Sequence, residues 1–324
     1  MIEVLRAGFL TSVQDLGRIG FRDSGVSQSG ALDESILRIL NVMVGNDEGA
    51  AGIEFTQGAL RLKLSDNRRV AWGGGDYQVE AGQTRIPPGH ICAVSAGEEI
   101  HIQGPKSGAR GWLAIAGGID VPLVLGSRST DARGNFGGCK GRYLIDGDEL
   151  PLGGQVAGDQ LKTPSPRISR WAAPQSWVQT GRGDVVLRVV RGSGWDLFDE
   201  PSRQAFLLSD FIVAAESDRM GARFNGSKLT RVINRDMISE AVAPGTIQVP
   251  PDGNPLVLLN DCQTIGGYPK IAHVISVDMT NAAQLRAGDT ARFCEVTLAE
   301  AQDLAATRAE EFARFRVGVQ MHYS

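Results

Sequence analysis

Short runs of alternating apolar and polar residues dominate this chain, and they predict a mainly β protein. Residues 2–6 and 185–190 alternate and are rich in β-branched side chains, so both segments are predicted strands. Two more short apolar runs, at 246–249 and 256–259, are predicted strands separated by the turn sequence Pro-Pro-Asp-Gly. Further short strands are predicted between turns from residue 53 to residue 115. The glycine content, 41 of 324 residues, fits a fold with many tight turns.

Helical periodicity is confined to a few segments. The clearest begins at Ser29 or Asp33 and ends at Gly45, because serine and aspartate cap helix N-termini and glycine terminates helices. Its apolar residues recur with the period of one buried helix face: Ile36, Leu37, Ile39, Leu40 and Met43. Residues 202–207 and the stretch after Leu298 are the other predicted helices.

The two halves of the chain contain similar segments in the same order, which indicates an internal repeat. Residues 2–8 resemble residues 187–192, and the turn at 86–89 resembles the turn at 249–253. Three more pairs of segments match in the same order, and the offset between the copies falls steadily along the chain. This shared order predicts two related β-barrel domains, the second shorter than the first.

The predicted domain boundary is a polar, proline-containing connector at residues 156–184. The first barrel would span residues 1–155. The second, with a C-terminal helix, would span residues 185–324. A cleft between two such barrels is a natural place for a binding site.

Composition and charge exclude several classes of protein. With 42% hydrophobic and 22% charged residues, the chain is typical of soluble globular proteins. The formal net charge of -4 gives no electrostatic reason to bind nucleic acid or an anionic membrane. No apolar run approaches the roughly 20 residues that a membrane-spanning helix needs, so we expect a cytoplasmic protein. The four cysteines and four histidines are widely scattered, so we expect free thiols and no metal site.

A polar cluster follows directly after the apolar run at 256–259. It contains the adjacent glycines Gly266 and Gly267 together with four polar candidates: Gln263, Thr264, Tyr268 and Lys270. Polar groups after a core strand, with glycines that admit a ligand or a second backbone, indicate a binding site. The alternative is a polar loop that caps a barrel, and this stretch alone does not decide between them.

A glycine-rich segment, residues 126–148, carries three arginines: Arg128, Arg133 and Arg142. A guanidinium can bind both oxygens of a carboxylate or phosphate, so these side chains suit an anionic ligand. Alternatively, the arginines fix the loop by pairing with neighbouring acids: Asp131, Asp146 and Asp148. The sequence contains no dinucleotide-binding fingerprint, no phosphate-binding Gly-x-x-x-x-Gly-Lys-Ser/Thr loop and no Gly-x-Ser-x-Gly motif.

An irregular polar segment, residues 11–30, precedes the first predicted helix. Asp15 and Arg18 could form a buried ion pair, and Ser29 with Asp33 could cap the helix. We favour these structural roles over catalysis.

Several motifs together resemble those of the biotin-dependent carboxyltransferase family, in particular its Kip-A type. They are Thr-Ser-Val-Gln-Asp-Leu-Gly-Arg at 11–18, Ser-Gly-Ala-Leu-Asp at 29–33, Gly-Ser-Arg-Ser-Thr at 126–130, Gly-Arg at 141–142 and Gln-Thr-Ile-Gly-Gly-Tyr-Pro at 263–269. The resemblance covers nearly the whole chain. It implies two cyclophilin-like β-barrels with a few short helices, in agreement with the repeat.

The resemblance also implies an enzyme subunit. Free-standing Kip-A-type proteins resemble one part of a three-part ATP-dependent 5-oxoprolinase, which hydrolyses 5-oxoproline to glutamate. The other two parts of that enzyme, a Kip-I-like protein and a third protein, are therefore the expected partners. The chain has no Ala-Met-Lys-Met biotinylation motif, so we expect no attached biotin. ATP would bind at a site shared with, or carried by, the partners.

Two alternatives remain open. One is a biotin-dependent carboxyltransferase component that acts on urea or a related amide. The other is a Kip-type regulatory protein that binds a kinase inhibitor.

Hydrolysis of an activated amide requires cationic and hydrogen-bonding groups directed at a developing oxyanion. The candidate catalytic residues are Arg128, Arg142, Tyr268 and Lys270. The candidate substrate-binding residues are Gln263, Thr264, Gly266, Gly267, Ser129, Arg18 and Asp33. We expect the site where the loop at 263–270 meets the loop at 128–142, across the two barrels.

Overall fold

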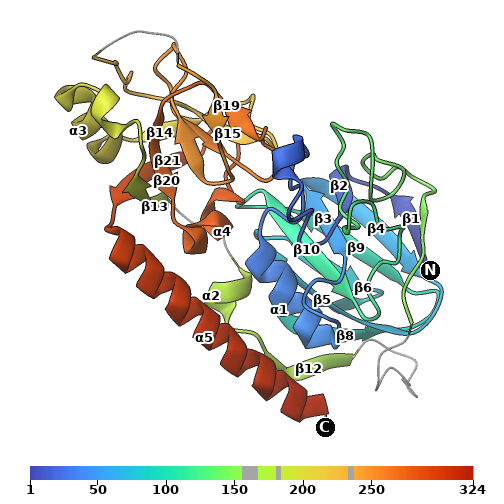
Figure 1. Cartoon of the computed structure of the whole chain (residues 1–324). Helices are drawn as coiled ribbons and strands as arrows, with labels where there is room; N and C mark the ends of the chain where they lie inside the picture. The colour runs from blue at the N-terminus through green and yellow to red at the C-terminus, as the bar shows by residue number, and fades with distance from the viewer. Residues whose placement is uncertain (155–166, 180–183, 233–236, 324) are drawn as a thin grey trace. The chain divides into compact units, whose positions relative to one another are not determined.

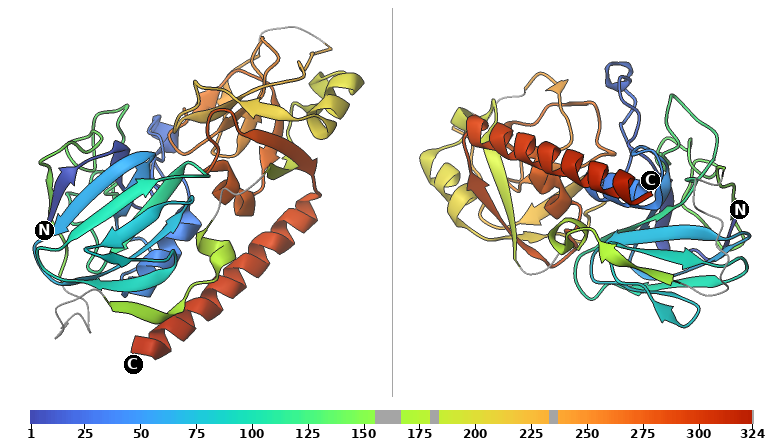
Figure 2. Two further views of the ribbon diagram at one scale, coloured as in Figure 1. Left: turned by 180° about the vertical axis from the view of Figure 1, so that it is seen from behind. Right: turned by 90° about the horizontal axis from the view of Figure 1, so that it is seen from below.

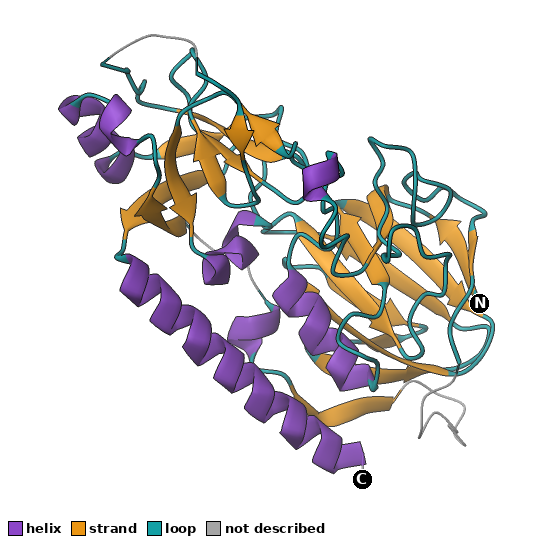
Figure 3. Cartoon of the chain, viewed as in Figure 1, coloured by secondary structure: helices purple, strands orange, loops and turns teal. Residues whose placement is uncertain are grey.

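The computed structural model describes residues 1–154, 167–179, 184–232 and 237–323 (Figure 1). The chain divides into two compact units. Unit 1 contains the described residues within 1–18, 29–181 and 312–324, and unit 2 those within 19–28 and 182–311. The expected mainly β fold with a few helices is confirmed (Figure 3).

Unit 1 is built from two six-stranded antiparallel sheets. In hydrogen-bonding order, the first contains β11 (Glu149–Leu150), β1 (Ile2–Arg6), β4 (Gly58–Leu64), β9 (Glu99–Gly104), β6 (Gln78–Ala81) and β7 (Thr84–Arg85). The second contains β12 (Arg167–Ala172), β8 (His90–Val94), β5 (Arg68–Gly74), β10 (Arg110–Ile115), β3 (Gly52–Thr56) and β2 (Phe9–Gln14). The described strands of unit 1 thus pair within two sheets.

The core of unit 1 contains side chains from both sheets. Val4 and Leu62 come from the first sheet, and Val70 and Leu113 from the second. Every residue of β5 and β10 is buried. The helix α1 (Glu34–Val44) packs on these two strands and covers the face of the sheet that the core does not (Figure 1). Strands covered on both faces need continuous apolar sequence, which explains why their pattern does not alternate.

The helix α1 begins and ends as its sequence predicts. The Asp33 carboxylate accepts a hydrogen bond from the Ile36 N–H at 3.0 Å and so caps the N-terminus. At the C-terminus, Gly45 has a φ of 86°, a left-handed conformation that glycine adopts without strain. All five apolar positions predicted for the buried face are buried.

Seven strands of unit 2 close into a barrel (Figure 2). In order they are β13 (Val185–Arg191), β20 (Lys270–Val274), β17 (Thr246–Gln248), β18 (Leu256–Leu258), β15 (Gly221–Asn225), β14 (Phe211–Val213) and β21 (Thr290–Glu295). Neighbouring strands are antiparallel except β13 and β21, which are parallel. A separate ribbon joins β16 (Glu240–Ala241) to β19 (Ile265–Gly266). The predicted strands at 185–190, 246–249 and 256–259 are therefore confirmed.

The remaining helices include two that the sequence predicts, α3 (Glu200–Leu208) and α5 (Leu298–Tyr323), and two short ones, α2 (Gln175–Val178) and α4 (Met279–Ala282). Single 3₁₀ turns occur at Arg22–Ser24, Trp195–Leu197 and Ser276–Asp278. With 26 residues, α5 is longer than expected. Its less exposed positions recur every three or four residues: Ala301, Leu304, Ala305, Arg308, Phe312, Phe315 and Val319. Among the described residues, no helix has the length and apolar content needed to span a bilayer.

Part of the predicted connector at 156–184 falls outside the described residues, namely 156–166 and 180–183. Its described part forms β12, which pairs with β8, and α2. Both elements belong to unit 1.

Four phenylalanines form the centre of unit 2. The rings of Phe206 and Phe293 stack with centroids 4.5 Å apart, and Phe211 and Phe224 lie 5.5 Å and 5.6 Å from Phe293. All four are buried. Phe206 comes from α3 and the others from β14, β15 and β21, so this cluster fixes the helix to the barrel.

Replacing Phe206 with alanine should lower the free energy of unfolding by about 3–5 kcal/mol, because it leaves a cavity in this cluster. Leu208→Ala, on the same helix, is the matched control, since Leu208 is 82% exposed. The control should change stability by less than about 0.5 kcal/mol. Urea unfolding followed by tryptophan fluorescence would measure both, because Trp195 contacts Phe206 with centroids 6.2 Å apart. Equal losses in the two variants would contradict the role assigned to the cluster.

Candidate functional site

In unit 1, the carboxylate of Asp15 is the acceptor of a buried hydrogen-bond network. It accepts from the Ser127 hydroxyl at 2.6 Å and from the Arg128 backbone N–H at 2.6 Å. The Gly17 N–H donates at 2.8 Å, and the Ser129 hydroxyl donates as well. Ser129 is completely buried, so these contacts favour a structural role for this predicted substrate-binding residue.

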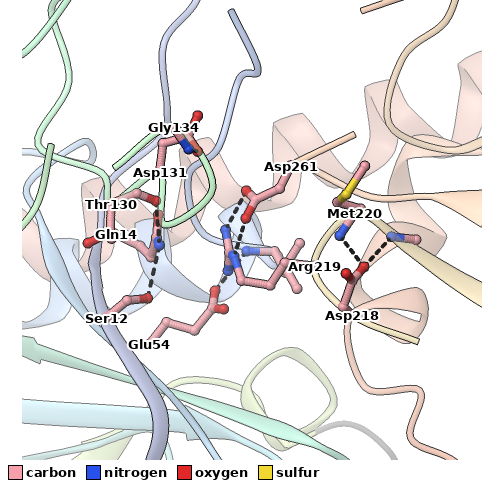
Figure 4. A network of polar contacts seen from close by, with 12 residues as sticks. Ser12, Gln14, Glu54, Thr130, Asp131, Gly134, Asp218, Arg219, Met220 and Asp261 are labelled. Carbon is pink, nitrogen blue, oxygen red and sulfur yellow. Dashed lines mark hydrogen bonds and ion pairs between the residues drawn. The ribbon is translucent and has the colours of Figure 1, made fainter. Parts of the chain in front are cut away.

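The same network extends along β2 (Figure 4). The Gln14 amide donates to the Ser12 hydroxyl at 2.9 Å and to the Thr130 carbonyl oxygen at 3.3 Å. These polar side chains are buried, and hydrogen bonds between them replace those to water. The strand is therefore polar in sequence although it lies in the interior, which explains why alternation does not reveal it.

Arg18 and Asp33, two further predicted substrate-binding residues, are also buried. The Arg18 Nη2 donates to the Ser129 carbonyl oxygen, and its guanidinium lies 4.6 Å from the centroid of the Phe136 ring. Asp33 caps α1. These contacts favour a structural role for Arg18, with Ser129 and Phe136 rather than Asp15 as its described partners, and the capping role that the sequence indicates for Asp33.

The Arg128 side chain lines an open cavity of about 440 Å³ in unit 1. It donates to the Asp120 carboxylate at 2.5 Å, and Asp47 also lines the cavity. Five glycines contribute to the wall: Gly45, Gly49, Gly117, Gly118 and Gly154. Two carboxylates accompany one guanidinium, so the cavity does not have the positive potential that a polyanion would need.

Arg142 forms a two-point ion pair with Asp148. Its Nη1 and Nη2 each donate to one carboxylate oxygen at 2.7 Å, and Nη1 also donates to the Tyr143 carbonyl oxygen at 2.9 Å. Hydrogen bonding within the pair raises the pKa of Arg142 and lowers the pKa of Asp148. Of the two readings of the arginine-rich segment, the contacts of Arg142 favour the one in which arginine fixes the loop.

In unit 2, the loop at 263–270 is held to the barrel by a buried glutamine that the sequence analysis missed. Gln248, on β17, is completely buried. Its amide donates to the Tyr268 carbonyl oxygen at 3.2 Å and accepts from the Gln263 side chain at 3.4 Å. A Cβ at Gly266 would lie 2.7 Å from the Gln248 side-chain nitrogen, so a larger residue here would displace this amide.

Lys270 binds β16, one strand of the two-stranded ribbon that β16 forms with β19. Its ammonium lies 2.7 Å from the Glu240 carboxylate and donates to the Ala241 carbonyl oxygen at 3.0 Å. The side chain is only 12% exposed. Thr264 participates through its backbone, because its carbonyl oxygen accepts from the Val242 N–H at 3.1 Å. A Cβ at Gly267 would lie 3.4 Å from the Met237 carbonyl oxygen, an ordinary van der Waals distance, so this position has room for a larger residue.

Arg22 is the second residue that sequence reasoning missed; it contacts the loop at 263–270 from a distant part of the sequence. It lies in the segment Ile19–Gln28, which belongs to unit 2. Its Nη2 donates to the carbonyl oxygens of Val242 at 2.7 Å and Gln263 at 3.0 Å, and lies 3.8 Å from the Cys262 sulfur. The Arg22 Nη1 is buried and has no hydrogen-bond partner among the described residues.

The start of the loop is also fixed. Arg219 and Asp261 form an ion pair at 2.8 Å, with both side chains almost fully buried (Figure 4). Burial raises the pKa of the adjacent Cys262 thiol, and the nearby Arg22 partly offsets that effect. Cys262 is a free thiol, like the other three cysteines. A buried thiol with a raised pKa is a poor nucleophile, so we assign it no catalytic role.

The loop therefore combines a rigid backbone with exposed side chains. Tyr268 is 44% exposed and Ile265 is 61% exposed. The phenol of Tyr268 and the amide of Gln263 can both donate hydrogen bonds to a ligand, whereas the Arg22 Nη1 is buried out of a ligand's reach. A preorganised set of donors suits a ligand with carbonyl or carboxylate oxygens.

Six of the predicted site residues thus belong to this loop in unit 2: Gln263, Thr264, Gly266, Gly267, Tyr268 and Lys270. The other five belong to unit 1: Arg18, Asp33, Ser129, Arg128 and Arg142. The expected meeting of the two loops stays a prediction. Within the described residues, no group of three or more His, Cys, Asp or Glu side chains is placed to hold a metal ion.

The Arg142–Asp148 pair predicts how stability depends on pH. The pair lowers the pKa of Asp148 in the folded state, so its contribution is present above the unfolded-state pKa and is lost as the pH falls through the folded-state pKa. Asp148→Asn should cost about 1–3 kcal/mol at neutral pH. The difference from wild type should shrink below about pH 4, where unfolded aspartate protonates.

Urea unfolding at several pH values would measure this difference. Asp120→Asn is the control, because Asp120 is 54% exposed and also pairs with an arginine. A constant difference between wild type and Asp148→Asn down to acid pH would contradict the ionic origin of the effect.

Comparison with known proteins places these features in one family. Residues 24–295 match the family model described as carboxyltransferase domain, subdomain A and B. The chain is 39% identical to the C subunit of 5-oxoprolinase from Escherichia coli K12 over 301 residues, which is 93% of each chain. It is 34% identical to the 5-oxoprolinase C subunit of Haemophilus influenzae, over 94% of each chain.

Solved structures also resemble this chain. The crystal structure of the K. lactis urea amidolyase aligns with a TM-score of 0.88 and 30% identity over 97% of this chain, but over only 20% of that much longer chain. The resemblance seen in the motifs at 11–18, 29–33, 126–130 and 263–269 is therefore confirmed. By the family model and by its relatives, the chain belongs to the carboxyltransferase family, subdomains A and B.

Proposed function

We propose that this chain is a subunit of a 5-oxoprolinase, which hydrolyses 5-oxoproline to glutamate with ATP and partner subunits. The observation that carries the proposal is the near full-length similarity to two proteins named as the C subunit of 5-oxoprolinase. Because the similarity covers both chains almost completely, it does not depend on one shared segment. The partners we propose are a Kip-I-like protein, as the B subunit, and a third protein, as the A subunit.

The loop at 263–270 is the part of the chain that best suits this reaction. Opening a cyclic amide places negative charge on the former carbonyl oxygen, and fixed donors stabilise such charge. Tyr268 offers an exposed hydroxyl, and Gln263 offers a partly exposed amide. Lys270 forms an ion pair with Glu240 and so chiefly fixes the ribbon of β16 and β19. It stays a candidate catalytic residue.

ATP fits the described cavities of this chain poorly. The cavity of unit 1 has Arg128 with two carboxylates, Asp47 and Asp120. An open cavity of unit 2 has Arg223 with Glu216 and Asp252. A triphosphate would meet excess negative charge in either one. We therefore propose that the partners carry ATP or supply the cations of a shared site. Because the chain has no Ala-Met-Lys-Met motif, we also propose that it carries no biotin.

The second candidate function is a carboxyltransferase component that acts on urea or a related amide. The structural similarity to the K. lactis urea amidolyase supports it. The two functions differ in their requirements, because carboxyl transfer needs a biotin-bearing protein and 5-oxoproline hydrolysis does not. The preferred substrate of the reconstituted complex, 5-oxoproline or urea, distinguishes them.

The purified chain alone should not hydrolyse ATP in the presence of 5-oxoproline, and activity should appear when the two partner proteins are added. The reasons are the missing phosphate-binding loop and the excess negative charge of the two cavities described above. Release of phosphate and glutamate, measured for each combination of the three proteins, would test this. Robust turnover by the single chain would contradict the proposal.

Tyr268→Phe should reduce kcat/KM of the reconstituted complex about ten- to a hundred-fold, the cost of one charge-assisted hydrogen bond. The melting temperature should stay the same, because the hydroxyl is lost from a side chain that is 44% exposed. Steady-state kinetics and scanning calorimetry would measure the two effects. Full activity in this variant would remove Tyr268 from the site.

A further inference from the structure

We propose that Gln263 recognises the edge of a cis-amide, on which an N–H and a C=O lie side by side, and that the buried Gln248 orients the Gln263 side chain for this task. Both residues belong to unit 2. A cis-amide edge is present in 5-oxoproline and in urea, the two candidate substrates under the proposed function, so the inference rests on that function. It adds which group of the substrate is read and which residue orients the reader.

A backbone carbonyl oxygen fixes the orientation of the Gln248 amide. Gln248 ends β17 and is completely buried. Its Nε2 lies 3.2 Å from the Tyr268 carbonyl oxygen. That oxygen can only accept a hydrogen bond, so Gln248 must turn its nitrogen toward Tyr268 and its Oε1 away from it. The opposite orientation would leave two buried acceptors facing each other, which is costly.

Gln248 passes this orientation on to Gln263. The Gln248 Oε1 accepts from the Gln263 Nε2 at 3.4 Å, so Gln263 directs its nitrogen toward Gln248. A side-chain amide has two N–H groups and one oxygen, so one N–H and the Oε1 of Gln263 remain. Neither has a hydrogen-bond partner among the described residues, and the side chain is partly exposed. Gln263 therefore offers a donor and an acceptor to a ligand, with the positions of nitrogen and oxygen already set.

The surroundings of both glutamines are fixed as well. The Arg22 Nη2 donates to the Gln263 carbonyl oxygen at 3.0 Å, and the preceding residue, Cys262, is completely buried. Gly266 provides the space in which the Gln248 amide lies, because a Cβ there would be 2.7 Å from its Nε2. Gln263 is thus held through its backbone and through its side chain. Such preorganisation reduces the entropic cost of binding a ligand.

The donor and acceptor of Gln263 select the class of ligand. A glutamine or asparagine side chain can bind an adjacent donor and acceptor at once, as it does on the edge of adenine. A lactam and urea each present an N–H beside a C=O, which match the oxygen and the N–H of Gln263. An ester or a carboxylate presents only acceptors there, and an amine only donors. The pairing needs no added charge, which fits a loop whose cation Lys270 is already paired with Glu240.

Competition binding to the reconstituted complex of the three proteins would test this recognition. Radiolabelled 5-oxoproline is the probe, measured by equilibrium dialysis with a non-hydrolysable ATP analogue present. The competitor 3-oxocyclopentane-1-carboxylate has a CH₂ group in place of the ring N–H and keeps the carbonyl and the carboxylate. It should compete at least about tenfold more weakly than unlabelled 5-oxoproline, because it leaves the Gln263 Oε1 without its donor. Gln263→Leu should remove most of this preference.

Two further variants test the orienting role of Gln248. Gln248→Met removes the orienting amide, and Gly266→Ala displaces it while keeping every hydrogen-bonding group. Each should lower the preference for 5-oxoproline over the analogue at least about threefold, and neither should change it further when combined with Gln263→Leu. A merely structural role would weaken both ligands alike and leave the preference unchanged. Gln302→Glu, on the exposed face of α5, is the control and should behave as wild type.

The outcomes separate this inference from the proposed function. If the wild-type complex with ATP does not hydrolyse 5-oxoproline, the proposed function is refuted and the inference falls with it. Hydrolysis by the wild-type complex with an unchanged preference in Gln263→Leu would overturn the inference alone. A preference lost in Gln263→Leu but kept in both Gln248→Met and Gly266→Ala would overturn the role of Gln248.

Discussion

Hydrogen bonding to one buried carboxylate, that of Asp15, constrains the path of the chain on which the candidate site depends. A carboxylate removed from water must recover its hydrogen bonds from the protein, and Asp15 does so with hydroxyl and backbone donors. Its own carbonyl oxygen accepts from the Ala31 N–H at 2.9 Å. The backbone at residues 15–17 is thus held beside residues 30–31. Gly30 permits this approach, because a Cβ there would lie 2.8 Å from the Gly17 nitrogen.

Between these two fixed points lies the segment Ile19–Gln28, and the most important side chain in it is Arg22. Carbonyl oxygens in a loop need donors just as those in a strand do. Arg22 supplies donors to Val242 and Gln263, which flank the ribbon formed by β16 and β19. A planar guanidinium can serve several acceptors at once, whereas a lysine ammonium could not reproduce that geometry. The segment before the first helix therefore stabilises a loop more than two hundred residues further along the chain.

Local rules predicted the elements whose hydrophobic pattern is visible in the sequence. The helix α1 shows its period, its cap at Asp33 and its terminating glycine in sequence, and the strands β1, β13, β17 and β18 show short apolar runs. The sequence failed at β2, because its buried side chains are polar and bond one another. It also could not choose among partners for Arg142, since three aspartates lie nearby in sequence and only the fold selects Asp148. Gln248 carried a readable signal, a glutamine between two apolar residues of a strand, whereas Arg22 carried none.

The distribution of charge in the candidate loop limits what the loop can bind by itself. The cations in and beside the loop already form ion pairs: Lys270 with Glu240, and Arg219 with Asp261. A cation that is already ion-paired helps to fix the backbone but contributes little to binding an added anion, because its charge is already balanced. The groups that remain for a ligand are hydrogen-bond donors, chiefly Tyr268 and Gln263. Such a loop can orient a carbonyl compound and stabilise a developing oxyanion. For the proposed function, positive charge that the reaction needs beyond these donors would come from a partner chain.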